Sequence, residues 1–322
     1  MPIIATITWL HWTAFVLAVL FFLALDLGVF HRKAHSVRFK EALIWTGIWF
    51  AMAMLFAWGL KKLLGQQEAI EFVTGYIVEL SLSMDNVFVI ALIFGYFRVP
   101  LPYQHRVLFW GILGALIMRG MMIGAGAALV RQFEWTLMIF GAFLVFSGIK
   151  MLFTKEEGVD PEKNLVIRLA HKLLPVSPHF EKHHFTTRLN GRRVFTPLAM
   201  VLAMVETSDL VFALDSIPAI FGITTNEFIV FTSNVFAILG LRSLYFVLAG
   251  AIEYFRFLKF GLSWVLVFIG AKMLLAKFLH VSTSLSLYIV GAIILTAILA
   301  SVGVSWVEYR HQLKNGKTNR EL

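Results

Sequence analysis

"ELSLSMDNVFVIALIFGYF", residues 79–97, is almost entirely apolar and yet contains two carboxylates, Glu79 and Asp85. A second apolar stretch, "VETSDLVFALDSIPAIFG" (residues 205–222), contains three more, Glu206, Asp209 and Asp215. Runs of this length predict helices that cross a lipid bilayer, because about 20 apolar residues span its hydrocarbon core. Acids inside such helices are rare and mark functional sites.

The rest of the chain has the same apolar character. It has 322 residues, of which 59% are hydrophobic and only 15% charged, and its mean hydropathy is +0.80. A soluble domain of this size would expose far more charge, and the sequence lacks the period-two alternation of a membrane barrel. We therefore predict an all-α, polytopic membrane helical bundle that forms a single integral membrane domain over residues 1–322. The nine predicted spans cover residues 6–30, 41–64, 70–97, 106–130, 134–153, 195–222, 227–251, 259–279 and 284–307.

The basic residues predict an orientation for these spans. If the N-terminus lies outside, most Lys and Arg of the connecting segments lie in the cytoplasm, and the exceptions are Lys61, Lys62, Arg131 and Lys277. Cytoplasmic loops of membrane proteins carry such an excess of basic residues. We therefore expect the N-terminus outside, the C-terminus in the cytoplasm, and the one long polar segment, residues 154–194, as a cytoplasmic loop. The first span lacks a basic start and a cleavage site, so we expect a retained helix and not a signal peptide.

Composition also excludes several classes of function. The chain has no cysteine, which rules out disulfides, thiolate metal ligands and dithiol redox chemistry by the protein itself. The basic residues behind its net charge of +9 lie mostly in every other loop. We therefore expect a lipid bilayer and not a nucleic acid as its partner. The spans show neither an intramembrane protease signature nor a pair of haem ligands, so we expect no enzymatic activity and no bound cofactor. Composition specifies no oligomeric state.

The chain also repeats itself. "QFEWTLMIFGAFLVFSGIKML" (residues 132–152) matches "YFRFLKFGLSWVLVFIGAKML" (residues 254–274), and Asp85 aligns with Asp209. Each copy contains three spans, an odd number, so the copies, residues 70–153 and 195–279, should cross the membrane in opposite directions. The remaining spans, 6–30, 41–64 and 284–307, would flank them. Inverted repeats are a transporter architecture, with the substrate site near the midplane where the copies meet. Chance similarity of two apolar segments is the alternative.

The five intramembrane carboxylates require a compensating charge. Each charged side chain at the centre of a membrane helix costs about 2.5–3.5 kcal/mol. Two arginines within spans, Arg119 and Arg242, are candidates to balance two of the acids. Three acids would then remain, and a bound cation or a proton would neutralise them.

Helical geometry places these acids on different faces. Glu79 and Asn86 share one face of an ideal helix, whereas Asp85 points about 120° away. In the second stretch, Asp215 likewise points away from the other two acids. We therefore expect both acidic helices to be broken or bent, with Pro218 as a helix breaker, so that all five acids meet around one cavity.

The donor set consists of oxygen atoms. No histidine lies deep in a span, and carboxylates and amides favour Mn²⁺, Mg²⁺ or Ca²⁺ over Cu, Zn or Ni. The predicted metal ligands are Glu79, Asp85, Glu206, Asp209 and Asp215, with Asn86 as a further candidate because it adjoins Asp85. Neutral donors could come from Ser208, Ser216, Ser233 and Asn234, although serine in membrane helices more often reflects close packing.

These motifs resemble the TerC family of integral membrane proteins, and most closely its Alx-type members. The matching pieces are "GYIVELSLSMDNVFV", "LGALIMRGMMI", "IFGAFLVFSGIKM", "VETSDLVFALDSIPAIFGIT" and "TSNVFAILGLRSLYF". The resemblance implies a bacterial inner-membrane protein, alkali-inducible and linked to manganese export, whose five acids occupy the positions on which the family relies. Family members have also been described as tellurite-resistance or redox-modulating factors.

Together these observations predict a transporter that exports a divalent cation from the cytoplasm. Mn²⁺ is the first candidate, and Ca²⁺ or another hard divalent cation is the next. Five acids and two arginines sum to a charge of −3, which a divalent cation reduces to −1, so coupling to a proton is a further expectation. The alternative is a membrane accessory factor in metal, tellurite or redox stress resistance that transports nothing itself.

Overall fold

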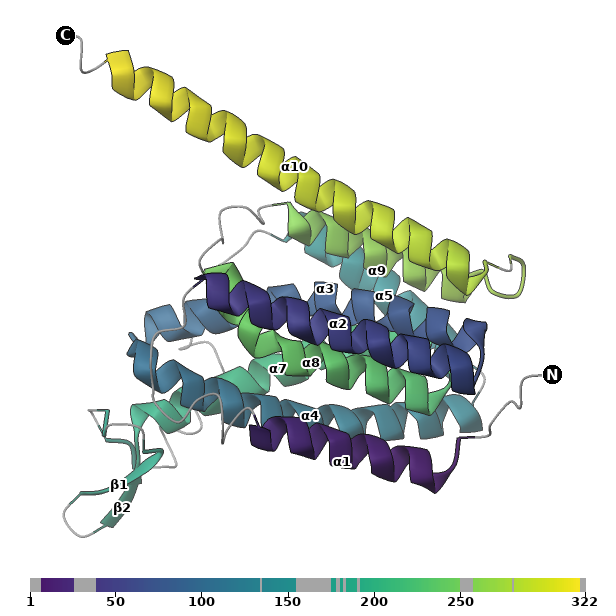
Figure 1. Cartoon of the computed structure of the whole chain (residues 1–322), viewed down its shortest axis with the longest axis horizontal. Helices are drawn as coiled ribbons and strands as arrows, with labels where there is room; N and C mark the ends of the chain where they lie inside the picture. The colour runs from purple at the N-terminus through teal and green to yellow at the C-terminus, as the bar shows by residue number, and fades with distance from the viewer. Residues whose placement is uncertain are drawn as a thin grey trace.

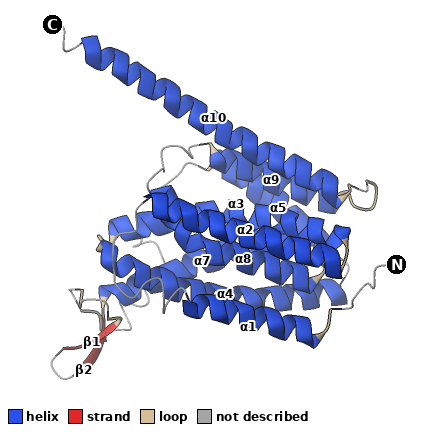
Figure 2. Ribbon diagram, viewed as in Figure 1, coloured by secondary structure: helices blue, strands red, loops and turns tan. Residues whose placement is uncertain are grey.

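The computed structural model describes residues 7–25, 39–133, 135–154, 175–177, 180–181, 184–189, 192–249, 257–279 and 281–318. These residues form a bundle of long helices with one short β-hairpin at one end (Figure 1, Figure 2). The described helices are α1 (Trp9–Leu25), α2 (Phe39–Leu63), α3 (Gln66–Tyr96), α4 (Leu101–Gln132), α5 (Thr136–Phe153), α7 (Pro197–Phe221), α8 (Glu227–Ala249), α9 (Leu258–Leu274) and α10 (Thr283–Thr318). The predicted all-α membrane bundle is confirmed.

Each predicted span corresponds to one described helix. Seven of these helices have at least 18 residues and are apolar enough to cross a membrane. The other two, α1 and α9, have 17 residues each, which corresponds to about 25 Å and falls slightly short of a hydrocarbon core of about 30 Å. At the other extreme, α10 has 36 residues and extends beyond the rest of the bundle (Figure 1).

Helix α3 lies in the middle of the bundle. It packs against α2, α7, α8, α9 and α10, and Figure 1 shows neighbouring helices on several sides of it. The neighbouring helix α8 is also enclosed by protein, since 94% of its most apolar 18-residue stretch is buried. Apolar clusters fill the spaces between these helices, one of them around Phe72, Tyr76 and Phe236. Side chains on almost every face of α3 therefore meet protein.

The expectation of broken acidic helices is wrong. Helix α3 continues without interruption through Glu79 and Asp85, and α7 continues through Pro218 to Phe221. The physical reason is the central position of α3: acids on faces about 120° apart each meet a different neighbouring helix, so unwinding is not needed to bury them. Pro218 lies in the last turn of α7, where it ends the helix and does not interrupt it.

Helices α5 and α9 make the closest contact between the two halves of the chain. A Cβ added at Gly270 would lie 2.6 Å from the carbonyl oxygen of Gly141, and one added at Gly148 would lie 2.7 Å from the carbonyl oxygen of Ser263. These contacts run antiparallel, since position 141 meets 270 and position 148 meets 263. They are also reciprocal, because Gly148 aligns with Gly270 and Gly141 with Ser263 in the sequence repeat. Reciprocal contacts of this kind are typical of an interface built around a two-fold axis.

The segment expected to be a polar loop contains a β-hairpin. Strands β1 (Thr186–Leu189) and β2 (Arg192–Phe195) pair antiparallel, with Thr186 opposite Phe195. The guanidinium of Arg106 lies over the Phe185 ring, 5.1 Å from its centroid, so the hairpin is attached to the start of α4. Much of the segment 154–194 lies outside the described residues.

Candidate functional site

Arg119 of α4 is the centre of a buried polar cluster. Its guanidinium donates from Nη2 to Asp209 Oδ1 at 3.0 Å and from Nε to Asp209 Oδ2 at 3.3 Å. It also forms an ion pair with Glu79 and donates to the Ser216 hydroxyl at 3.3 Å. Arg119 is only 2% exposed and Glu79 is fully buried. One arginine therefore joins α3, α4 and α7 through two carboxylates, with the two-pronged geometry that guanidinium and carboxylate favour.

Beside Arg119, one face of α3 presents several buried oxygen atoms that accept no hydrogen bond. Asn86 is 4% exposed and donates from Nδ2 to Asp209 Oδ1 at 3.3 Å, but its Oδ1 accepts no hydrogen bond. The same is true of Glu79 Oε2 and Ser83 Oγ. Steps of four and three residues place these side chains on one helix face. Buried acceptors without partners are uncommon in native proteins and point to a ligand or water that would satisfy them.

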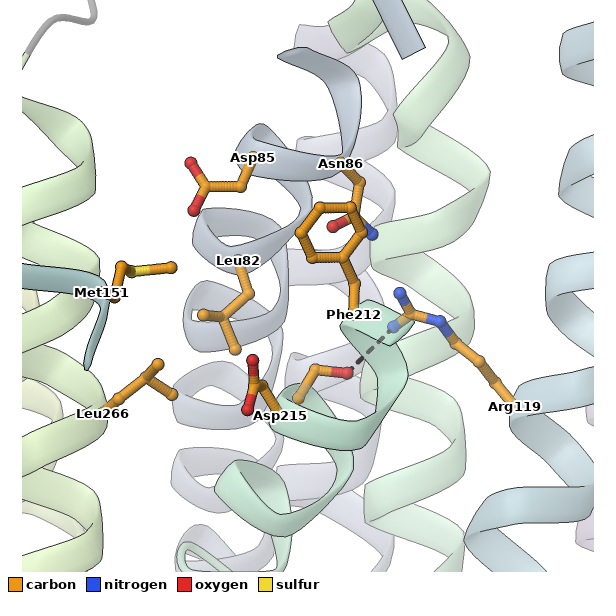
Figure 3. Close-up of a pocket in the computed structure, with 9 residues that line it drawn as sticks. Leu82, Asp85, Asn86, Arg119, Met151, Phe212, Asp215 and Leu266 are labelled. Carbon is orange, nitrogen blue, oxygen red and sulfur yellow. Dashed lines mark hydrogen bonds between the residues drawn. The ribbon is translucent and has the colours of Figure 1, made fainter. Parts of the chain in front are cut away.

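A small cavity opens next to Asn86 and Arg119. The residues that line it are Leu82, Asp85, Asn86, Arg119, Met151, Phe212, Asp215, Ser216 and Leu266. Its space corresponds to roughly one water molecule or one small cation. In the view of Figure 3, the Asp85 and Asp215 carboxylates lie towards Met151 and Leu266, whereas Arg119 approaches from the opposite side. The cavity therefore has two carboxylates on one side and a guanidinium on the other.

Asp215 is held in place by α5. Its Oδ1 accepts a hydrogen bond from the Ser147 hydroxyl at 2.6 Å, and Lys150, one turn further along α5, is close enough to interact with it electrostatically. Ser147 directly precedes Gly148, whose missing side chain lets α5 approach α9. The close α5–α9 contact thus positions the donor that orients Asp215.

The last predicted ligand, Glu206, and the second predicted arginine, Arg242, do not line the cavity. Glu206 is half-buried, and its carboxylate lies against Gly114 of α4, where an added Cβ would overlap it. It does not line the cavity described above. Arg242 lies beside His105, with Nη2 and Nδ1 3.2 Å apart. The five acids are therefore distributed over three places: the Arg119 cluster, the cavity and the surface of α4 at Gly114.

Comparison with known proteins identifies the family of the chain. A family model, "Integral membrane protein TerC family", matches residues 64–312, which include every acid considered above. The chain belongs to the TerC family. Its similarity to individual members covers nearly the whole length of both proteins, as follows. An uncharacterized membrane protein of Myxococcus xanthus is 50% identical over 90% of this chain and 91% of its own. A protein of Escherichia coli strain K12, named "Putative membrane-bound redox modulator Alx", is 44% identical over 95% of this chain and 98% of its own. No solved structure matches the chain.

Within the described part of this TerC family member, no group of three or more His, Cys, Asp and Glu side chains lies close enough together to hold a metal ion. The metal-ligand role of the five acids stays a prediction. If a cation enters, it would meet two carboxylates, Asp85 and Asp215, together with the neutral oxygens of Asn86 and Ser216. Hard divalent cations accept such mixed oxygen sets and retain water at the remaining positions.

Sequence reasoning missed one residue of this TerC site, the Ser147 donor to Asp215. A single sequence holds no usable signal for it, because a serine in a membrane helix more often reflects close packing than a polar contact. Ser216 was among the candidate neutral donors, and the structure places it between Arg119 and the cavity.

Proposed function

We propose that this TerC family member is a transporter that exports a hard divalent cation from the cytoplasm, with Mn²⁺ as the first candidate and Ca²⁺ as the next. The observation that carries the proposal is the cavity between Asp85 and Asp215, with the unpaired Asn86 Oδ1 on its wall. A buried amide oxygen without a donor is a ready cation ligand, and it adjoins two carboxylates within helices long enough to span a membrane.

The charge of the site favours a cation over a neutral or anionic substrate. Four acids, Glu79, Asp85, Asp209 and Asp215, outnumber the basic side chains described beside them, Arg119 and Lys150. A divalent cation would reduce this excess of negative charge. Intramembrane charge is expensive, so the binding of a cation would stabilise the bundle. The oxygen donors favour Mn²⁺, Ca²⁺ or Mg²⁺, since no thiolate exists in the chain.

The reciprocal contact of α5 and α9 supports the second part of the proposal, that the chain is built from two inverted repeats. Residues 70–153 and 195–279 would then each contribute one acidic helix to the cavity, α3 and α7. This is the arrangement in which transporters bind substrate between repeats and expose it alternately to the two sides. We further propose an inner-membrane location with the N-terminus outside, and protons as the coupling ion for export.

A second candidate function follows from the relatives. Several are named as membrane-bound redox modulators, which favours an accessory role in metal, tellurite or redox stress without transport. The chain has no cysteine, so we propose that any redox effect is indirect and that the protein is not an enzyme.

Uptake of metal by proteoliposomes separates the two functions. The purified protein is reconstituted with a metal-sensitive dye inside the vesicles, and Mn²⁺, Ca²⁺, Mg²⁺ and Zn²⁺ are added outside. We expect Mn²⁺ entry, and we expect Asp85→Asn and Asp215→Asn each to lower its initial rate about tenfold or more, because each removes an anionic ligand. Glu227→Gln is the matched control, since this acid pairs with Arg131 at the start of α8. A parent protein that moves none of the four ions faster than empty vesicles would refute transport and favour the accessory role.

A further inference from the structure

Arg119 forms part of the wall of the cavity in which we place the cation. Its guanidinium lines that cavity and also holds Asp209 with two hydrogen bonds. Asn86 has the same double position, since it lines the cavity and donates to Asp209. Asp209 is thus separated from the cavity only by groups that could rearrange, and its carboxylate is occupied by a positive charge of the protein itself.

We propose that Arg119 is a built-in competitor of the transported cation: its guanidinium occupies Asp209 until a divalent cation in the Asp85–Asp215 cavity displaces it. This inference rests on the proposed function and adds a gating residue to it. A divalent cation beside Arg119 repels the guanidinium and attracts Asp209, so the two cations cannot share this carboxylate favourably.

The structure offers the displaced guanidinium another position. Arg119 already forms an ion pair with Glu79, and Glu79 Oε2 accepts no hydrogen bond. The hydroxyl of Ser83, on the same face of α3, is also without a partner. An arginine that leaves Asp209 can therefore turn towards Glu79 and remain neutralised inside the membrane. Glu79 would anchor the guanidinium in both states, whereas Asp209 would alternate between arginine and cation.

The two acids share Arg119 but differ in a second contact. Both are buried and neither lines the cavity. Asp209 also accepts a hydrogen bond from Asn86, a second side chain of the cavity wall, so a change in the cavity would act on two of the donors to Asp209. Releasing the cation would return Arg119 to Asp209, so the site would not retain a tightly bound metal after delivery.

The test uses two variants and one control. Arg119→Gln removes the competitor, but it leaves a buried acid without its partner and can fail to fold. The double variant Glu79→Gln with Arg119→Gln removes one acid and one base, so it retains the net charge of the parent site. Arg131→Gln is the control, because this arginine is exposed and pairs with Glu227 outside the cluster. Mn²⁺ affinity is measured by titration of the purified proteins, and the increase in melting temperature on addition of Mn²⁺ is measured in parallel.

We expect the double variant to bind Mn²⁺ about tenfold more tightly than the parent, as it would if Arg119 left the parent site open roughly a tenth of the time. Its melting temperature should rise more with Mn²⁺ than that of the parent, since tighter binding stabilises the folded state more, while transport slows because release is slower. Arg131→Gln should match the parent. If the parent transports Mn²⁺ and the double variant binds it no more tightly, Arg119 is only a structural counter-ion and the inference fails alone. If none of the proteins binds a divalent cation, the proposed function and the inference both fail.

Discussion

Replacing glycine by alanine at three helix positions tests the packing that positions the site. Gly270 of α9 has close backbone neighbours: a Cβ there would lie 2.6 Å from the Gly141 carbonyl oxygen and 2.9 Å from the Val145 nitrogen. At Gly114 of α4 the nearest neighbour is the end of the flexible Glu206 side chain, and Gly291 of α10 has nothing within 4 Å. Alanine in a helix interior is favoured over glycine by about 1 kcal/mol. The three substitutions share this gain and differ only in what the new methyl group meets.

At Gly270 the neighbouring backbone cannot move without separating α5 from α9. Overpacking of this kind costs about 1–3 kcal/mol, so Gly270→Ala should destabilise by up to about 2 kcal/mol after the helix gain. At Gly114 the Glu206 side chain can change its rotamer, at a cost of about 0.5–1.5 kcal/mol, so stability should change little. Gly291→Ala should be neutral or stabilising by up to about 1 kcal/mol.

Thermal unfolding of the purified variants in detergent measures this order. Each kcal/mol corresponds to about 2–4 °C in melting temperature for a chain of about 150–250 residues and to somewhat less for a longer one. The expected order is Gly291→Ala highest, Gly114→Ala next and Gly270→Ala clearly lowest. If Gly270→Ala melts at or above the temperature of Gly291→Ala, the close α5–α9 contact is not present in the protein, and the argument that it positions Ser147 fails with it.

Three further predictions concern single polar groups. Ser147→Ala should weaken Mn²⁺ binding about tenfold by releasing Asp215, since groups that orient metal ligands contribute at this level; titration that gives the affinity of the parent would contradict this. Asn234→Leu should raise the melting temperature by a few degrees, because both polar atoms of this 1% exposed amide lack hydrogen-bond partners. Removing these buried polar atoms should increase the free energy of unfolding by about 1–3 kcal/mol. Lost transport at unchanged stability would instead assign Asn234 to the cation path. Glu227→Gln should change the unfolding free energy by less than about 1 kcal/mol, because the ion pair with Arg131 is partly exposed, and chemical denaturation would reveal a larger effect.

The sequence predicted the fold well because its main signal is physical and local. Apolar runs about as long as the bilayer is thick identify helices such as α3 and α7 without any knowledge of their packing. The same local reasoning failed for the shape of these helices. Because helical periodicity says nothing about which helices surround α3, acids on two of its faces suggested that the helix must break for both to be buried. The structure shows that α3 has neighbouring helices on several sides, so both faces are buried without a break.

The candidate site was predictable in its members but not in its pairing. The cost of charge in a membrane singled out Glu79, Asp209 and Arg119, yet only the fold decides that this arginine bridges these two acids. A single sequence likewise holds no signal for the contact between Arg242 and His105.

The acids are stabilised by different groups because of how the helices pack in the bundle. A buried carboxylate is stabilised by a cation, by hydrogen-bond donors or by solvent. Glu79 and Asp209 receive the guanidinium of Arg119, and Asp215 receives the Ser147 hydroxyl. Each of these stabilising groups comes from a helix other than that of the acid, namely α4 or α5, and the acids themselves come from both halves of the chain. Arg119 and Ser147 both belong to the first half, so the second half alone could not bury Asp209 and Asp215 at an acceptable cost, and the site depends on the association of the two halves. A cation that binds between the halves would then act on the same contacts that hold them together, which is the coupling that a transporter requires.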